Sequence, residues 1–232
     1  MRFTSRLFSR TLLATAALTT LAACSDDPVS PANEGRVRAV HAVSNVTGLD
    51  VLFNSTTYKT NLAYKATDGY KAVGTGAASI KFRKNGVATD LATATQTIAN
   101  GADYTVIALG TEAAPQTLVL TDNNSAPAAG KAKLRAVHAA AGQGAVDVYI
   151  LANANDLAAA TADKANLAAK SASDYIVKDA GTYVVILTTA GTKTPVLTVN
   201  NVQVANGNVR TLLAVEKAGG GTPLEGVILA DK

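Results

Sequence analysis

The pentapeptide RAVHA occurs at residues 38–42 and again at residues 135–139 of a chain of 232 residues. Eight residues after each copy comes Asp-Val, with Asp50 in the first copy and Asp147 in the second. Further matched segments continue the parallel, from NLAYKATDGY against NLAAKSASDY to LVLTD against VILAD. The period is about 100 residues, which is the size of a domain and too long for a solenoid repeat. The sequence therefore predicts a duplicated domain.

The repeated segments show the alternation that is typical of β-strands. In the first copy, residues 37, 39, 41 and 43 share one side of the strand, and Arg36 and Arg38 lie on the other. Other segments are rich in β-branched residues and are separated by turn signals such as Asn85-Gly86. We therefore expect an all-β fold of two tandem, immunoglobulin-like, antiparallel β-sandwich domains, at residues 36–122 and 131–232 with a linker at 123–130.

Two segments of the second copy depart from the first. The alanine-rich stretch at residues 155–172 predicts a short helix or a long turn inserted in the second domain. The segment DAGTY, which ends at Tyr183, resembles the corner of immunoglobulin-like domains where a tyrosine hydroxyl bonds back to the backbone. The first copy has Ala78 at the place of Tyr183.

The first residues indicate export. Three arginines precede an uncharged, mostly apolar stretch of 13 residues from Thr11 to Ala23. A membrane-spanning helix needs about 20 such residues, so we expect residues 1–23 to be a signal peptide.

The end of that stretch resembles the lipobox of bacterial lipoproteins. Leu21-Ala22-Ala23 precedes Cys24, which is the only cysteine of the chain and so has no partner for an intrachain disulfide. We expect cleavage before Cys24, acylation of its thiol, and a flexible tether over residues 24–35. Ser25 follows the cysteine where many inner-membrane lipoproteins have aspartate, which favours the outer membrane.

Charge and motifs argue against several function classes. Without residues 1–23 the chain keeps 18 of its 21 basic residues against 17 acidic ones, and no basic cluster indicates nucleic-acid binding. The sequence has no His-Glu-x-x-His, Gly-x-Ser-x-Gly or P-loop motif. We therefore expect no catalytic residues, no metal site and no cofactor.

The chain also resembles a known family. The segments RVRAVHA…DV, NLAY…GY, AGTYVV and LVLTDNNSAPAAGKAKLRAVHA resemble the bacterial domain of unknown function numbered 4397, over nearly everything from Arg36 onward. The resemblance implies a secreted or lipid-anchored protein in which the domain occurs in tandem.

The two histidines of the chain leave alternatives open. His41 and His138 each precede an aspartate, Asp50 and Asp147, by nine residues, so a returning chain could bring each pair together. One hypothesis is a buried imidazole that bonds to the aspartate or to a backbone carbonyl. The others are a ligand or metal site, which would have few ligands for zinc, and a catalytic dyad, which would also need a nucleophile.

Three functions therefore compete. The leading hypothesis is a non-enzymatic, lipid-anchored cell-envelope protein that contacts membrane lipid through acylated Cys24 and presents two sandwiches to an envelope partner. The second is a carbohydrate- or peptidoglycan-binding module, which predicts exposed tyrosines near one end of a sandwich. The third is a metal-dependent enzyme that uses His41/Asp50 and His138/Asp147.

Overall fold

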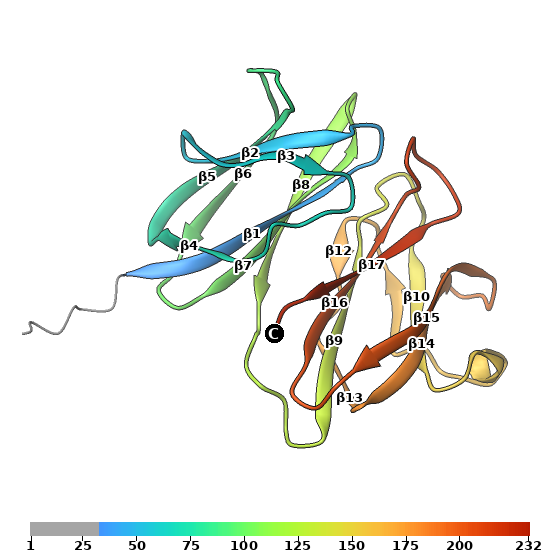
Figure 1. The fold of residues 1–232 in the computed structure, drawn as a ribbon. Helices are drawn as coiled ribbons and strands as arrows, with labels where there is room; N and C mark the ends of the chain where they lie inside the picture. Colours follow the sequence, from blue (N-terminus) through green and yellow to red (C-terminus); the bar gives the residue numbers. More distant parts are fainter. Residues whose placement is uncertain (1–32) are drawn as a thin grey trace, which may run out of the picture. The chain divides into compact units, whose positions relative to one another are not determined.

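The computed structural model describes residues 33–232, which belong to one compact unit. The expected signal peptide, Cys24 and most of the tether lie outside the described residues. Figure 1 shows strands as the main elements of the described chain, in agreement with the all-β prediction. No helix in this part of the chain has the length and apolar character needed to cross a bilayer.

The first repeat forms two four-stranded sheets. One, here called the first seam sheet, has the order β4 (Lys71–Gly74), β1 (Glu34–Val43), β7 (Asp103–Thr111) and β8 (Ala114–Asp122). The first outer sheet has the order β3 (Thr56–Ala63), β2 (Gly48–Phe53), β5 (Gly76–Lys84) and β6 (Asp90–Ile98).

The second repeat forms the corresponding pair of sheets. The second seam sheet has the order β12 (Ser171–Ala172), β9 (Lys131–His138), β16 (Val209–Val215) and β17 (Glu225–Ala230), with β13 (Ile176–Asp179) also paired to β9. The second outer sheet has the order β11 (Lys164–Leu167), β10 (Val146–Leu151), β14 (Gly181–Thr189) and β15 (Pro195–Val204).

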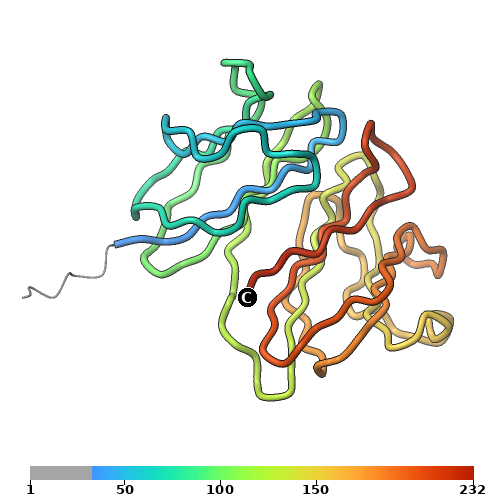
Figure 2. Tube along the Cα trace, in the orientation of Figure 1, coloured from blue at the N-terminus to red at the C-terminus, as the bar shows by residue number. Residues whose placement is uncertain are grey.

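Most strand pairs are antiparallel, but one pair in each repeat is parallel. β1 runs parallel to β7, with His41 opposite Ala108, and β9 runs parallel to β16, with His138 opposite Ala214. In Figure 2, the blue segment of β1 and the green segment of β7 run side by side although they are distant in sequence. The matching registers show that both repeats place their histidine at the same point of the same sheet.

The inward faces of the two sheets pack against each other within each repeat. In the first repeat Val37 and Ala39 of β1 meet Val51 of β2 and Phe82 of β5 in one buried cluster. In the second repeat Leu134, Val148, Leu187 and Leu212 belong to the equivalent cluster. These residues sit at alternate strand positions, as the period of two requires.

The insertion in the second repeat contains one short turn of helix. The element η1 (Ala154–Ala158) is a 3-10 helix, and the backbone amide of its second residue, Asn155, donates to the side chain of Asn153. The rest of the alanine-rich stretch forms β11 and β12 instead of further helix. This short element agrees with the predicted short helix or long turn.

The tyrosine corner is also present. The Tyr183 hydroxyl donates to the backbone oxygen of Asp179 at 2.8 Å. This is the bond back to the chain that the DAGTY segment predicted.

Candidate functional site

The two repeats meet through a third apolar cluster on the opposite faces of the seam sheets. Val40 and Ile107 from the first repeat pack there with Val137 and Leu213 from the second. We call this contact the seam. Both seam sheets are therefore covered on two faces. On the side of β1 that carries the arginines, Arg38, Val40 and Ala42 are buried, whereas Arg36 near the start of the strand is exposed.

Two ion pairs cross the seam, and equivalent residues of the two repeats form them. Arg38 of the first repeat donates to Asp231 of the second at 2.6 Å, and Arg135 of the second donates to Asp122 of the first at 2.6 Å. The two arginines are 1% and 3% exposed, and both aspartates are buried. Arg38 and Arg135 are the first residues of the two RAVHA segments. Each copy of the repeated segment therefore supplies the arginine of one ion pair across the seam.

Neutral donors complete the coordination of both carboxylates. Thr105 and Tyr70 donate to Asp122, at 2.5 and 2.6 Å. Thr211 and Tyr175 do the same for Asp231, at 2.6 and 3.2 Å.

The two tyrosines also face the arginines. The Arg38 guanidinium lies 4.6 Å from the ring centre of Tyr70, and that of Arg135 lies 4.7 Å from the ring centre of Tyr175. Burial and the neighbouring aspartates raise the pKa of both tyrosine hydroxyls, so both stay protonated donors. The sequence pattern alone did not identify these polar partners.

His41 is fully buried within the first repeat. Its Nδ1 accepts a hydrogen bond from the Val43 amide at 3.2 Å, so the proton of the neutral ring sits on Nε2. The ring meets Tyr64 edge to face, with ring centres 5.5 Å apart. Burial lowers the pKa of His41 to about 4, so the imidazole is neutral at neutral pH.

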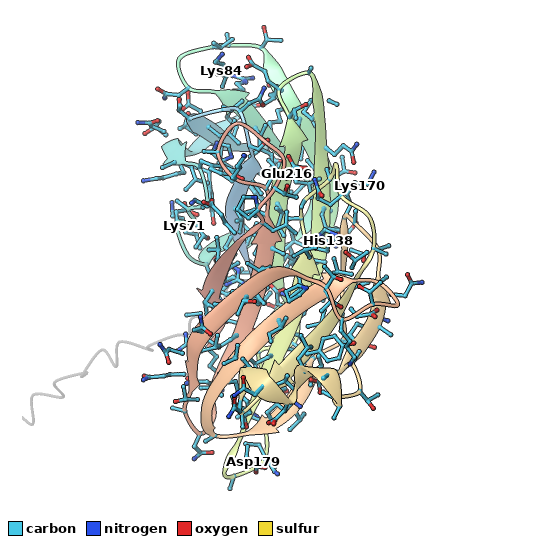
Figure 3. The ribbon with its side chains drawn as sticks, turned by 90° about the vertical axis from the view of Figure 1, so that its right-hand side faces the viewer. Lys71, Lys84, His138, Lys170, Asp179 and Glu216 are labelled. Carbon is cyan, nitrogen blue, oxygen red and sulfur yellow. The ribbon has the colours of Figure 1, made fainter. Side chains whose placement is uncertain are left out.

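His138 occupies the equivalent place in the second repeat (Figure 3). Its Nε2 lies 2.9 Å from the backbone oxygen of Gly144, which can only accept, so this nitrogen carries the proton. Burial also lowers the pKa of His138. Both histidines are therefore uncharged at neutral pH, and the His138 ring also holds the loop after its strand.

The structure does not bring either histidine into hydrogen-bond contact with its aspartate. Asp50 lies between Leu49 and Val51 on β2, and because those two neighbours point into the core, its carboxylate points outward. It accepts instead from the amides of Asn61 and Gly86. The expectation that a returning chain would join His41 to Asp50 is thus wrong for this geometry.

Asp147 behaves in the same way in the second repeat. Its carboxylate accepts from the amides of Asn166 and Gly191, at 2.7 and 2.8 Å. Within residues 33–232 no group of three or more His, Cys, Asp or Glu side chains is placed to hold a metal ion. The aspartates therefore organise loops.

Hydrogen bonds of the same kind hold the repeated NLA-x-Lys segments in place. Asn61 and Asn166 both have positive φ, a conformation that asparagine tolerates better than most residues. The backbone oxygens of His41 and His138 then accept from the amides of Lys65 and Lys170, at 2.8 and 2.6 Å.

Sequence reasoning did not identify an open groove on the first sandwich. One cavity of about 530 Å³ and another of about 340 Å³ share the lining residue Asn54. We call the two together the Asn54 groove. Its polar and aromatic lining residues come from the β2–β3 hairpin and from β5 and β6, and are Phe53, Asn54, Thr56, Thr57, Tyr58, Ser79, Thr95, Gln96 and Thr97.

The chemistry of the Asn54 groove is uniform. None of its lining residues carries a charge, and most of its polar side chains are hydroxyls or amides that both donate and accept. Phe53 and Tyr58 add half-buried rings whose centres are 6.4 Å apart. Such a surface can hydrogen-bond a neutral, hydroxyl-rich molecule and pack against its carbon-bound hydrogens.

The second repeat does not copy this groove. Leu151 stands where the first repeat has Asn54, and the chain continues directly into the inserted η1. Asn54 itself has a φ of 53° in the tight turn after β2, and its side-chain oxygen accepts from the Ser79 amide at 3.0 Å. The signals in the sequence were Asn54 at a turn and, separately, the alternating threonines Thr93, Thr95 and Thr97.

Comparison with known proteins gives a family match over part of the chain and a distant structural likeness. No curated protein matches the chain. Among solved structures, a carbohydrate-binding module of family CBM26 from Eubacterium rectale Amy13K, in complex with maltoheptaose, is 12% identical. The alignment covers 86% of this chain and 97% of that one, with a TM-score of 0.27. Residues 35–149, which span the first repeat and the start of the second, match the family described as a domain of unknown function, DUF4397.

Proposed function

We propose that this protein is a non-enzymatic, lipid-anchored binding protein of the bacterial cell envelope. Acylated Cys24 holds it at a membrane, residues 24–35 give it reach, and the two sandwiches act as one rigid body. The outer membrane is the proposed location, because Ser25 follows the acylated residue. The observation that supports a binding function most directly is the Asn54 groove.

Membrane attachment is tested by changing the acylated residue. The wild-type chain and Cys24→Ser are expressed in a Gram-negative host with a radiolabelled or alkyne-tagged fatty acid. The wild type should carry the label and sediment with membranes, and Cys24→Ser should do neither. Continued sedimentation of unlabelled Cys24→Ser with membranes would contradict the anchor.

A second candidate function, recognition of a neutral glycan, follows from the lining of the Asn54 groove. The charge of an ionic ligand would find no opposite charge in the groove, because none of the lining residues is charged. A saccharide would match the hydroxyl and amide groups, and its less polar ring face would match Phe53. Peptidoglycan, which carries carboxylates, fits this surface less well than an uncharged polysaccharide.

The test is retention on insoluble polysaccharides. The full chain carrying Cys24→Ser is incubated with cellulose, starch, chitin and peptidoglycan sacculi, and the bound fraction is measured. We expect retention on at least one neutral polysaccharide, weakened by Thr95→Ala and by Asn54→Gly, which keeps the positive φ accessible.

Thr93→Ala is the matched control. Thr93 is an exposed residue of the same strand as Thr95, but it does not line the groove. Equal loss of retention in Thr93→Ala and Thr95→Ala, or no retention of the wild type on any neutral polysaccharide, would reject the glycan candidate. Attachment through Cys24 would stand regardless of that result.

A further inference from the structure

The two repeats also differ in the loop that joins the third and fourth strands of each seam sheet. In the first repeat β7 ends at Thr111 and β8 begins at Ala114, which is a tight hairpin. In the second repeat β16 ends at Val215 and β17 begins only at Glu225. The longer loop contains three successive glycines, residues 219–221, each with positive φ.

This loop reaches across the seam to the first repeat. The Gly219 amide donates to the backbone oxygen of Ser44 at 2.7 Å, and Lys65 pairs with Glu225 at 2.8 Å. The loop thus closes one side of a cavity of about 490 Å³ between the repeats, which we call the seam cavity. Its volume is in the range of small-molecule sites, which are often found between domains.

Glu216 is the only charged residue that lines the seam cavity. It is 8% exposed and stands at the register position where the first repeat has Gly110 (Figure 3). Its Oε1 accepts from the Gly142 amide at 2.9 Å, and its Oε2 accepts from the Gly221 amide at 3.2 Å. Both oxygens act as acceptors, as in an ionised carboxylate.

No described cation neutralises this carboxylate, because Glu216 takes part in none of the ion pairs of residues 33–232. A buried charge is stabilised by a partner of opposite sign. A Cβ on Gly142 would lie 2.9 Å from Oε1, and a Cβ on Gly220 would lie 3.3 Å from Oε2. The Ser44 hydroxyl also donates to Oε2, at 3.5 Å. The glycines leave the rest of the approach to the carboxylate open.

We propose that the seam cavity binds a primary ammonium group through Glu216. The ammonium has three N–H donors, one of which would bond to Glu216. The side chains of Gln116 and Gln143, which line the same cavity, offer amide oxygens as acceptors for the other two. A divalent cation fits less well, because calcium takes six to eight oxygen ligands and the cavity lining supplies one carboxylate. A lipid headgroup and a free amine both provide this chemistry.

The test uses the full chain carrying Cys24→Ser, with calorimetric titration by ethanolamine and by butylamine. Both amines should bind, and their neutral counterparts ethylene glycol and butanol should not. Glu216→Gln keeps the shape of the side chain but removes its charge, and should weaken amine binding by about tenfold or more. Gln203→Ala, at an exposed position of β15 outside the seam cavity and the Asn54 groove, is the control and should bind like the parent.

A second variant keeps the test decisive if Glu216→Gln does not fold. Gln143→Ala removes only a half-exposed side chain, and should weaken amine binding by about threefold or more while circular dichroism stays unchanged. Sedimentation with phosphatidylethanolamine vesicles, but not with phosphatidylcholine vesicles, would assign the ammonium to a lipid. Amine binding without such sedimentation would assign it to a soluble molecule.

Three results would overturn the proposal. They are no binding of either amine by the parent chain, unchanged affinity in folded Glu216→Gln or in Gln143→Ala, and binding of calcium chloride in place of the amines. None of them bears on the Asn54 groove, since the two sites share no lining residue.

Discussion

Replacing Arg38 by methionine should destabilise the protein far more than the loss of an ordinary surface charge. Arg38 is 1% exposed, and its guanidinium donates to Asp231, to Thr105 and to the backbone oxygen of Ala230. Arg38→Met leaves the buried Asp231 carboxylate without its close cation, because the other arginine, Arg135, is 4.0 Å away. Removing one partner of a buried ion pair typically costs about 3–5 kcal/mol of unfolding free energy.

The matched control is Lys84→Met. Lys84 pairs with Glu112 at 2.9 Å, but both side chains are more than 40% exposed. An exposed pair contributes about 0–1 kcal/mol, so this substitution should change the unfolding free energy little.

Urea unfolding followed by far-ultraviolet circular dichroism measures both variants. A double-mutant cycle with Asp231→Asn should give a coupling energy of about 1–3 kcal/mol, because the double variant no longer buries a lone charge. A cost for Arg38→Met no larger than that for Lys84→Met, or a coupling energy near zero, would refute the reasoning. The mirrored pair, Arg135 and Asp122, should reproduce the result.

Two further predictions rest on the structure and a third rests on the sequence. The folded-state pKa of His41 is lowered to about 4, against an unfolded value of about 6.5. The unfolded chain therefore binds the proton first, and stability should fall by about 3 kcal/mol as pH drops from 6.5 to 4; an NMR titration of the His41 ring that gives a pKa near 6.5 would contradict this. Gly35→Ala should cost about 1–3 kcal/mol, because the added Cβ would lie 2.6 Å from Ile98 and 2.7 Å from a backbone oxygen. Gly74→Ala is the control, because no atom lies within 4 Å of the added Cβ, and it should leave the unfolding free energy nearly unchanged in the same urea assay. Equal losses of unfolding free energy in Gly35→Ala and Gly74→Ala would show that the close contacts at residue 35 do not cause the loss. Cys24→Ser should release the protein from membranes, as set out above.

Strand alternation and the internal repeat were enough to predict the all-β fold. The two seam sheets contain the repeated phrases, and the Asn-Gly pairs mark turns, as with Gly86 at a φ of 77°. Alternation also placed Arg38 on the face opposite His41. It could not show that this face is covered, because a strand pattern reports which residues share a side and not what lies against that side.

A signal for the seam was nevertheless present. Val40 and Ala42 share the face of Arg38, so β1 is apolar on both sides, as in sheets that are covered on both faces. The repeated aspartates at the ends of LVLTD and VILAD were noted as matches, but the sequence does not show that each one crosses to the other copy. Crossed pairing depends on how two folded sheets dock.

The histidines show a second limit. Sequence spacing suggested that His41 and Asp50 could meet, but the two residues belong to different sheets of one sandwich and Asp50 points away from the core. The Asn54 groove and the seam cavity depend on loop geometry, namely the turn at Asn54 and the glycines at residues 219–221. Loop geometry of this kind is not encoded in hydrophobic periodicity.

The most direct test of the central claim, that the seam holds both repeats as one rigid body, is a set of residual dipolar couplings for backbone amides. Couplings from the strands of residues 36–122 and of residues 131–232 are fitted separately to the structure. We predict the same alignment tensor, in magnitude and orientation, for both repeats. Two different tensors, or a clearly smaller one for either repeat, would show that the repeats move independently and would contradict the account.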